Sequence, residues 1–342
     1  MDKRSLVLLA KSKLKDPYVD GWEKDIYSFV LDWFSDTDQI NVSTSGSTGR
    51  PKKIVLKKSH MAKSARITLD FLKLKEGDKA LLCLPVNYIA GKMMIIRAFV
   101  GGLGLHYVKP SLHPDFSLYD TFDLIALVPS MLSETIKRGK AHDLERFNKI
   151  LLGGSAVPFE MEKALKGLQS YIWHSYGMTE TITHIALRSI NGKHASDWFT
   201  PLPGVKVSVS DDSTLKINYE KIGVADLMTN DIAEMDQKGN FIILGRKDNV
   251  IISGGLKIHI EEVEKKIERI INCDFIIYGL EDKHLGQKAV IFIEGRSNIP
   301  DSQALLEMKK MIPKAYFPKD IIVIDEFDRT ASGKIIRKNY VS

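Results

Sequence analysis

The chain alternates short apolar runs, rich in valine and isoleucine, with amphipathic stretches that have helical spacing. Residues 59–72 and 260–271 are two such stretches. Strands buried on both faces of a parallel sheet are continuous apolar runs, and helices connect them. The alternation therefore predicts an α/β fold with at least one largely parallel sheet. The expected strands cover residues 80–84, 124–128, 149–152, 205–209, 241–244, 275–278 and 289–293.

A polar link predicts where the chain divides. Gly245-Arg246-Lys247-Asp248 follows an expected strand, and the residues after it have a β-α-β pattern of their own. A length of 342 residues suits about two domains. We expect a large domain over residues 1–245 and a small one over residues 246–342.

Composition and charge exclude several classes of protein. The two cysteines, Cys83 and Cys273, cannot form a disulfide framework or a four-cysteine zinc site. The 49 basic and 43 acidic residues give a net charge of +6 that is spread along the chain, which argues against nucleic acid and suits an anionic small molecule. The best apolar run, residues 93–105, is interrupted by Arg97 and by glycines, so we expect a soluble cytoplasmic protein with no membrane span.

The sharpest motif is the segment of residues 43–52, which contains five hydroxyl side chains and two glycines and ends in Lys52. Glycines let backbone amides approach an anion, and hydroxyls and a lysine add donors and charge. It is not a Walker A loop, because it lacks Gly-Lys-Ser/Thr. A flexible linker is the alternative, but strand-like residues on both sides favour a phosphate-binding loop.

Four further stretches are weaker when each is taken alone. In residues 173–181, Glu180 among hydroxyls and an aromatic ring suits Mg²⁺ and a stacked base, although a helix start would have the same residues. Asp231 suits ribose hydroxyls, or is an ordinary loop acid. A ligand could pass close to the backbone at Ser253-Gly254-Gly255. Lys334 lies on a glycine–serine loop that would let its side chain move. Each segment could also be an ordinary surface turn.

Together and in this order, the five stretches resemble those of the adenylate-forming superfamily, which includes acyl- and aryl-CoA ligases. The match extends from residue 43 to about residue 338. Residues 84–92 and 181–188 look most like those of 2-succinylbenzoate–CoA ligases of menaquinone biosynthesis.

The resemblance implies a large α/β domain of the adenylate-forming type that binds ATP and the acid, and a small mobile C-terminal α+β domain. It implies two half-reactions. A carboxylate first attacks the α-phosphate of ATP and expels pyrophosphate, and the thiol of CoA then attacks the acyl-adenylate and releases AMP. ATP and CoA would be substrates, and Mg²⁺ would be the metal. The expected product is 2-succinylbenzoyl-CoA.

The resemblance also assigns roles to residues. The catalytic residues would be Lys334 and Thr179, with Glu180 as the magnesium ligand, and Asp248 would be the hinge. The β- and γ-phosphates would contact Ser43, Thr44, Ser45, Gly46, Ser47, Thr48, Gly49 and Lys52. The rest of the nucleotide would contact Gly153, Gly154, Ser155, Tyr176, Gly177, Asp231 and Arg246, and CoA would pass Ser253, Gly254 and Gly255.

The acyl pocket is expected at Tyr88, Lys92, Arg97 and His184. 2-Succinylbenzoate has a second carboxylate, and Lys92 is the first candidate to bind it, with Arg97, His184 and Arg188 as the alternatives. Tyr88 stands where many relatives have a gating histidine, and Asn230 replaces the usual glycine before Asp231.

The expected phosphate loop begins much nearer the N-terminus than in relatives. The shortened N-terminal part would leave core exposed, so a homodimer is expected.

Three other functions remain open at this stage. A ligase for another aryl or fatty acid would share the nucleotide residues, although Lys92 and Arg97 argue against a fatty acid. An adenylation domain for amino acids would usually carry an aspartate near the start of the acyl pocket, where this chain has Asn87 and Tyr88. A non-catalytic nucleotide-binding remnant would need neither Glu180 nor Lys334.

Overall fold

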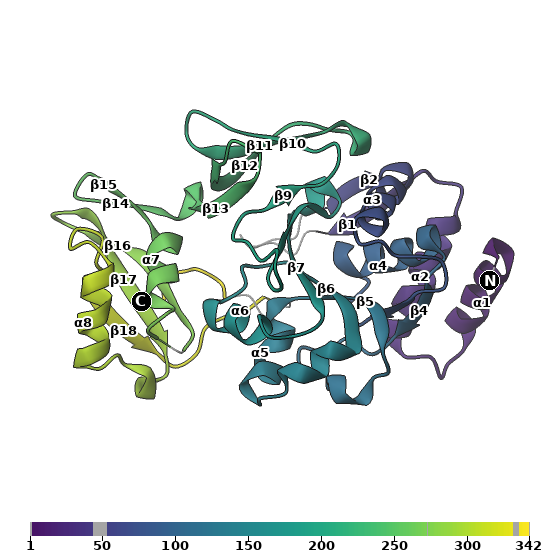
Figure 1. Cartoon of the computed structure of the whole chain (residues 1–342), viewed down its shortest axis with the longest axis horizontal. Coiled ribbons are helices and arrows are strands. Elements are labelled where there is room, and N and C mark those ends of the chain that lie inside the picture. Colours follow the sequence, from purple (N-terminus) through teal and green to yellow (C-terminus); the bar gives the residue numbers. More distant parts are fainter. Residues whose placement is uncertain (1, 44–52, 272, 331–334, 342) are drawn as a thin grey trace. The chain divides into compact units, whose positions relative to one another are not determined.

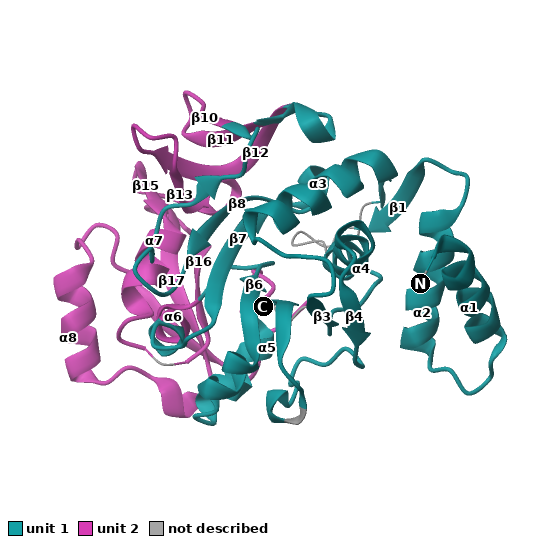
Figure 2. Cartoon of the chain, turned by 45° about the vertical axis from the view of Figure 1, so that its right-hand side comes forward, with its two compact units in different colours: residues 1–157, 163–206, 218–225 teal, residues 158–162, 207–217, 226–342 magenta. Residues whose placement is uncertain are grey.

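The computed structural model (Figure 1) describes residues 2–43, 53–271, 273–330 and 335–341. The chain forms two compact units, coloured separately in Figure 2. The first comprises residues 1–157, 163–206 and 218–225, and the second comprises residues 158–162, 207–217 and 226–342. The predicted domain boundary between residues 245 and 246 lies inside the second unit. The division into a large domain over residues 1–245 and a small mobile domain over residues 246–342 stays a prediction.

The first unit is built on a seven-stranded sheet with the order β4-β3-β5-β6-β7-β8-β9. Five neighbouring strands are parallel and the last two are antiparallel. The α/β fold with a largely parallel sheet is therefore confirmed. The strands are β3 (Lys79–Leu82), β4 (Gly104–Tyr107), β5 (Phe122–Leu127), β6 (Phe147–Leu152), β7 (Tyr171–Gly177), β8 (His184–Ser189) and β9 (Thr200–Pro201).

The direction of the crossovers changes between β3 and β5. From β3 the chain moves to β4 on one side, whereas from β5 it moves to β6 and β7 on the other side. Right-handed crossovers then place their helices on opposite faces of the sheet, and ligands of such sheets bind beyond the carboxyl ends of the strands at this switch point. The helices of this unit beside the sheet are α3 (Lys58–Phe71), α4 (Ile89–Gly101), α5 (Pro129–Lys137) and α6 (Phe159–Leu165), the last of which is shared with the second unit.

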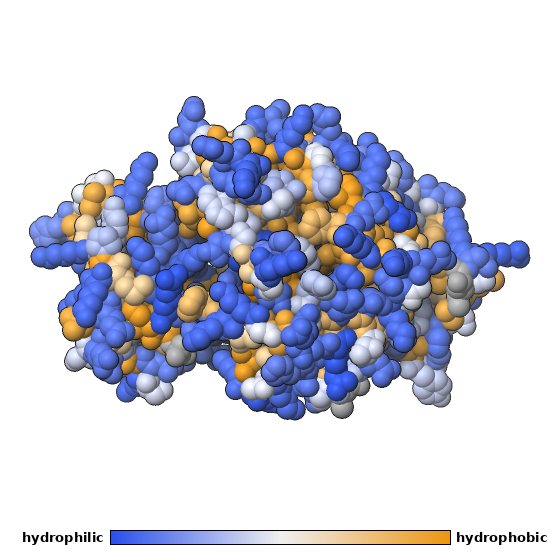
Figure 3. Space-filling model, viewed as in Figure 1, coloured by the Kyte–Doolittle hydropathy of each residue, from blue (hydrophilic) through white to orange (hydrophobic). Residues whose placement is uncertain are grey.

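The apolar run at residues 93–105 belongs largely to α4. Met93, Ile95 and Ile96 have no exposed surface, so this helix is apolar because it is surrounded by protein. It ends at Gly102, whose φ of 66° forms the left-handed C-cap. Among the described residues, no helix is long and apolar enough to cross a membrane. Hydrophilic side chains cover most of the face shown in Figure 3.

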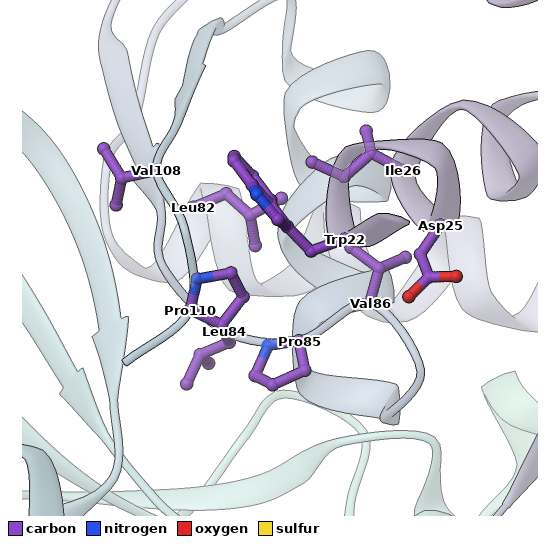
Figure 4. Close-up of a pocket in the computed structure, with 9 residues that line it drawn as sticks. All are labelled: Trp22, Asp25, Ile26, Leu82, Leu84, Pro85, Val86, Val108 and Pro110. Carbon is purple, nitrogen blue, oxygen red and sulfur yellow. The ribbon is translucent and has the colours of Figure 1, made fainter. Parts of the chain in front are cut away.

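Two N-terminal helices, α1 (Lys3–Lys15) and α2 (Gly21–Phe34), pack on the edge of this unit. The Asp2 carboxylate caps α1 by accepting a hydrogen bond from the Ser5 amide at 3.0 Å. The Tyr27 hydroxyl of α2 meets the Tyr107 hydroxyl of β4 at 2.8 Å. Figure 4 shows Trp22, Asp25 and Ile26 of α2 beside Pro85 and Val86, around a cavity of about 30 Å³. That volume holds about one water molecule, so this cavity is not an acyl pocket.

The antiparallel strands β1 (Gln39–Ser43) and β2 (Lys53–Lys57) flank the expected phosphate loop. Ser43 pairs with Lys53 at the end of this ladder. The strands expected on both sides of the loop are therefore present, and residues 44–52 lie outside the described residues.

The second unit contains most of one antiparallel sheet and all of another. The first is formed by β10 (Lys206–Val209), β11 (Thr214–Tyr219), β12 (Val224–Met235) and β13 (Phe241–Arg246). The second is formed by β14 (Val250–Ser253), β15 (Leu256–His259), β16 (Phe275–Asp282), β17 (Gly286–Glu294) and β18 (Asp320–Ile324), with β18 parallel to β17. Helices α7 (Ile260–Ile267) and α8 (Ser302–Met311) bury Val263, Ile267 and Met308 in the core of this unit.

A largely buried ion pair ties the C-terminal segment to this core. Arg337 donates to both carboxylate oxygens of Glu264, at 2.8 and 2.5 Å, and to the Ile277 carbonyl at 3.1 Å. Glu264 also accepts a hydrogen bond from the Ile277 amide at 2.6 Å. Burial raises the pKa of Glu264, and the charge and hydrogen bonds of Arg337 oppose this rise. The pair therefore joins α7, β16 and the segment that follows Lys334.

We expect Arg337→Met to destabilise the second unit by about 3 kcal/mol, because it leaves the buried Glu264 carboxylate without its cation. Denaturant unfolding of the purified variant measures this change. The matched control is Lys338→Met, which breaks the exposed pair with Asp328 and should change the unfolding free energy little. Equal effects of the two variants would contradict this assignment.

Candidate active site

The predicted nucleotide residues of the first unit gather where three parallel strands end. Leu127 of β5 pairs with Leu152 of β6, which pairs with His174 of β7. The strands run the same way, so the segments that follow them meet at one edge of the sheet. These segments are Val128-Pro129-Ser130, Gly153-Gly154-Ser155 and the Thr179-Glu180 turn.

The loop Gly153–Ser155 is expected beside the adenine and is here named the adenine-side loop. Contacts hold it closely on both sides. The Gly153 amide donates to the Leu127 carbonyl at 3.1 Å. A Cβ at Gly153 would lie 2.5 Å from the Ser175 Oγ atom, which itself donates to the Leu152 carbonyl at 2.8 Å. Gly154 has a φ of 93°, which side chains with a Cβ rarely adopt. Both glycines are therefore required by the geometry of this loop.

The turn after β7 is also tightly constrained. A Cβ at Gly177 would lie 2.3 Å from the Thr183 carbonyl oxygen. The buried Thr181 hydroxyl binds the backbone of Met178 and Thr183, and it holds the short 3-10 helix η3 (Thr179–Thr181). Ile182 has a φ of 67°, a strained value for a β-branched residue. Such strain persists only where the surrounding contacts enforce it.

Glu180 is exposed at this turn, and Thr179 is half-buried. Mg²⁺ bound with a nucleotide usually takes one or two carboxylates together with phosphate oxygens and water. Among the described residues there is no cluster of three or more histidine, cysteine, aspartate or glutamate side chains. A single accessible carboxylate therefore fits magnesium carried by ATP better than a fully protein-built metal site.

In the second unit, Arg246 joins the predicted ribose ligand to the predicted hinge. Asp231 of β12 and Arg246 of β13 are paired in register, and their side chains meet at 3.1 Å. Arg246 also donates two hydrogen bonds of 2.9 Å to Asp248. Burial works against ionisation of Asp248, but Arg246 outweighs it and lowers the pKa of this carboxyl. Arg246 therefore stabilises the charged form of Asp248.

The expected CoA-path residues form the tip of the β14–β15 hairpin. Gly254 and Gly255 have φ values of 57° and 80°, as a two-residue type I′ turn requires, and Ser253 is buried. Lys334 lies outside the described residues. Arg329 and Ile335, on either side of its loop, form an antiparallel bridge.

Two of the expected acyl-pocket residues belong to one buried network. The Thr68 hydroxyl donates to the Ser64 carbonyl at 3.1 Å, so it accepts from His184 Nε2, also at 3.1 Å. His184 Nδ1 is then an acceptor, and the Thr183 hydroxyl donates to it at 3.2 Å. Arg97 donates to the same Thr183 hydroxyl at 3.2 Å. Burial and the charge of Arg97 lower the pKa of His184 well below its usual range, so this histidine is neutral.

Lys92 has different neighbours from Arg97. Its ammonium group lies 4.7 Å from the centre of the Phe29 ring on α2. Burial lowers the pKa of Lys92, whereas Asp32 and Asp25 oppose this shift. The two cations are five positions apart on α4, which turns them by about 140° around the helix axis. Tyr88, at the N-cap of α4, is half-buried.

Sequence reasoning assigned no role to Thr68, Thr183 or His174. Thr68 is 116 positions from its partner His184, and no local pattern links the two. His174 belongs to a motif whose identification depends on Tyr176 and Glu180. His174 is two positions from Ile172 on β7, so both side chains point to the same buried face of the strand. This period of two is the signal that could have indicated a buried histidine.

Comparison with known protein families identifies the family of this chain. The sequence profile described as AMP-binding enzyme matches residues 42–223. The chain belongs to this family. It is therefore an AMP-forming acid–thiol ligase, which uses ATP, Mg²⁺ and CoA, and the predicted membership of the adenylate-forming superfamily is confirmed.

Curated relatives include the 2-succinylbenzoate–CoA ligases of Staphylococcus aureus strain MRSA252 and Oceanobacillus iheyensis. They are 28% and 25% identical to this chain, cover 92% and 86% of it, and are themselves covered over 69% and 68% of their lengths.

A solved acyl-CoA synthetase-like protein of Dyadobacter fermentans is 31% identical over 96% of this chain and 95% of its own, with a TM-score of 0.64. The o-succinylbenzoate CoA synthetase of Bacillus subtilis, solved with ATP and magnesium ion, covers 87% of this chain and 68% of its own. It has a TM-score of 0.72 at 22% identity, and it supports the fold.

We expect Gly177→Ala to lower the rate of adenylate formation by about 100-fold. The added Cβ would displace the backbone beside Thr179 and Glu180. A shift of about 1 Å in reacting groups has an effect of this size. Pyrophosphate release, measured on folded protein, checks this. Gly167→Ala is the matched control, because nothing lies within 4 Å of a Cβ there. A Gly177→Ala enzyme as active as Gly167→Ala would contradict the tight turn.

Proposed function

We propose that this ligase forms 2-succinylbenzoyl-CoA from 2-succinylbenzoate, ATP and CoA, as a step of menaquinone biosynthesis. The names of the curated relatives support this substrate. The observation that carries the proposal is that Arg97 is buried without a carboxylate partner among the described residues. The proposed setting is the cytoplasm, and the homodimer expected from the sequence stays a prediction.

Arg97 is a cation that is buried in the first unit. Its residue is 2% exposed, and burial lowers the pKa of the guanidinium to about 10, so it stays charged at neutral pH. It donates to Thr183 and to the Met94 sulfur, and its Nε atom has no hydrogen-bond partner among the described residues. Within the part of the chain that the structure describes, no carboxylate pairs with it.

A buried charge without a partner is expensive, so a protein keeps one where a ligand supplies the opposite charge. The second carboxylate of 2-succinylbenzoate has the charge and the planar geometry that suit a guanidinium fork. Lys92 is the weaker candidate, because it already lies over Phe29 with Asp25 and Asp32 nearby.

The proposed chemistry follows the family. One carboxylate oxygen of the substrate bonds to the α-phosphorus of ATP as the bond to pyrophosphate breaks. In this step Thr179 would contact the α-phosphate and Lys334 would bridge it to the carboxylate, so that both developing charges are neutralised. Magnesium held with Glu180 would supply further charge neutralisation when bound. Asp231 and Arg246 would hold the ribose.

In the second step the CoA sulfur bonds to the acyl carbon, and the bond to AMP breaks. Lys334 must withdraw first, which is why a rotation about Asp248 is proposed. Because Arg246 binds both Asp231 and Asp248, the ribose ligand and the hinge would be linked through one guanidinium.

The direct test is mass spectrometry of the products formed from ATP, Mg²⁺ and CoA with one of three acids: 2-succinylbenzoate, benzoate or octanoate. We expect 2-succinylbenzoyl-CoA and AMP from the first acid alone. A thioester with benzoate or octanoate at equal efficiency would overturn the proposed substrate. Absence of AMP with every acid would favour a nucleotide-binding remnant.

We expect Arg97→Met to raise the KM for 2-succinylbenzoate by about 10- to 100-fold, the scale of a lost hydrogen bond to a charged group. The same change should raise the melting temperature, because it removes a buried unpaired charge and leaves a side chain of similar length. Steady-state kinetics and calorimetry measure the two effects. Lys92→Met is the control and should leave this KM nearly unchanged. The reverse pattern, with Lys92 essential and Arg97 dispensable, would move the second carboxylate to Lys92.

A further inference from the structure

A second buried network in the first unit reaches the adenine-side loop. His174 and Arg188 face each other across the antiparallel pair β7 and β8, and each residue is 8% exposed. Arg188 Nε donates to His174 Nδ1 at 3.1 Å. On its other side, His174 Nε2 lies 3.1 Å from the Ser155 carbonyl oxygen.

The direction of these hydrogen bonds follows from the donors available. The guanidinium Nε–H can only donate, so His174 Nδ1 must be the acceptor. The ring proton is therefore on Nε2, and it is donated to the Ser155 carbonyl. Burial and the charge of Arg188 lower the pKa of His174 to about 3, so the ring stays neutral and keeps this tautomer in the working pH range.

Arg188 is itself held in place. Its Nη1 donates to the Ser196 carbonyl at 3.3 Å and lies 3.7 Å from the exposed Asp197 carboxylate. Its guanidinium carbon lies 5.6 Å from the centre of the Phe199 ring. The same ring lies 5.1 Å from His174 and 5.8 Å from Tyr176. Phe199 therefore packs against the histidine and also against the residue expected to flank the adenine.

We propose that Arg188, His174 and Phe199 are positioning residues for the adenine base, which fix the adenine-side loop and the Tyr176 ring relative to each other. His174 fixes the loop at Ser155, and Phe199 supports the Tyr176 ring. The inference rests on the predicted adenine contacts of this loop and of Tyr176, and it is independent of the acid that the enzyme activates.

The test measures nucleotide binding without any acid. Dissociation constants for Mg-ATP and Mg-GTP are determined by calorimetry on the whole chain. His174→Leu keeps the volume of the side chain but cannot donate to Ser155 or accept from Arg188. We expect it to weaken ATP binding by about tenfold, the scale of one lost hydrogen bond, and to reduce the preference for ATP over GTP by a similar factor.

Two further variants separate positioning from stability. In His174→Gln the amide nitrogen can donate to Ser155 and the amide oxygen can accept from Arg188, so most of the ATP affinity should return. Asn191→Leu removes the hydrogen bonds to Ile172, Ser170 and Leu168 at the far end of β7. It should lower the melting temperature and leave the ATP and GTP constants unchanged.

Three results would overturn the inference. One is unchanged ATP affinity in a folded His174→Leu protein. Another is equal weakening of ATP and GTP, since the effect would then not concern the base. The third is a loss in Asn191→Leu that matches the loss in His174→Leu. If His174→Leu does not fold, Arg188→Met gives the same test, because methionine has no N–H group to donate to His174 Nδ1 and fix its tautomer.

Discussion

Parallel pairing of β3, β5, β6 and β7 is the constraint on which the site in the first unit depends. It brings the ends of strands that are far apart in sequence to one edge of the sheet. The loops that follow then have little space. A Cβ at Gly153 or Gly177 would clash with a neighbouring oxygen, at 2.5 and 2.3 Å, well inside van der Waals contact. The close packing of these segments is thus enough to require glycine at both positions.

Several features that lower the stability of the protein lie around this edge of the sheet. Arg97 is a buried charge whose Nε atom finds no hydrogen-bond partner in the described part of the chain, and Ile182 has a strained backbone. Each lowers stability in the unliganded protein. By contrast, His184 and His174 are neutral and have both ring nitrogens in hydrogen bonds.

Sequence reasoning predicted the parts of the fold that depend on local pattern. The Val- and Ile-rich runs are strands in the structure. The helix predicted over residues 260–271 begins at Ile260, as expected, and ends earlier, at Ile267. The apolar run at residues 93–105 lies largely in α4, and the burial of this helix explains its apolar residues. The pocket cation was harder to choose, because Lys92 and Arg97 share one helix and differ in what packs against each side. Contacts such as Thr68 with His184 depend on tertiary structure and leave no local signal.

The most direct measurement is a crystal structure of the protein with a non-hydrolysable 2-succinylbenzoyl-adenylate analogue. Arg97 should lie within hydrogen-bond distance of the free carboxylate, with its Nε atom now paired, and the adenine should lie between the adenine-side loop and Tyr176. A free carboxylate paired with Lys92, or exposed to solvent with Arg97 unchanged, would contradict the role given to the buried arginine.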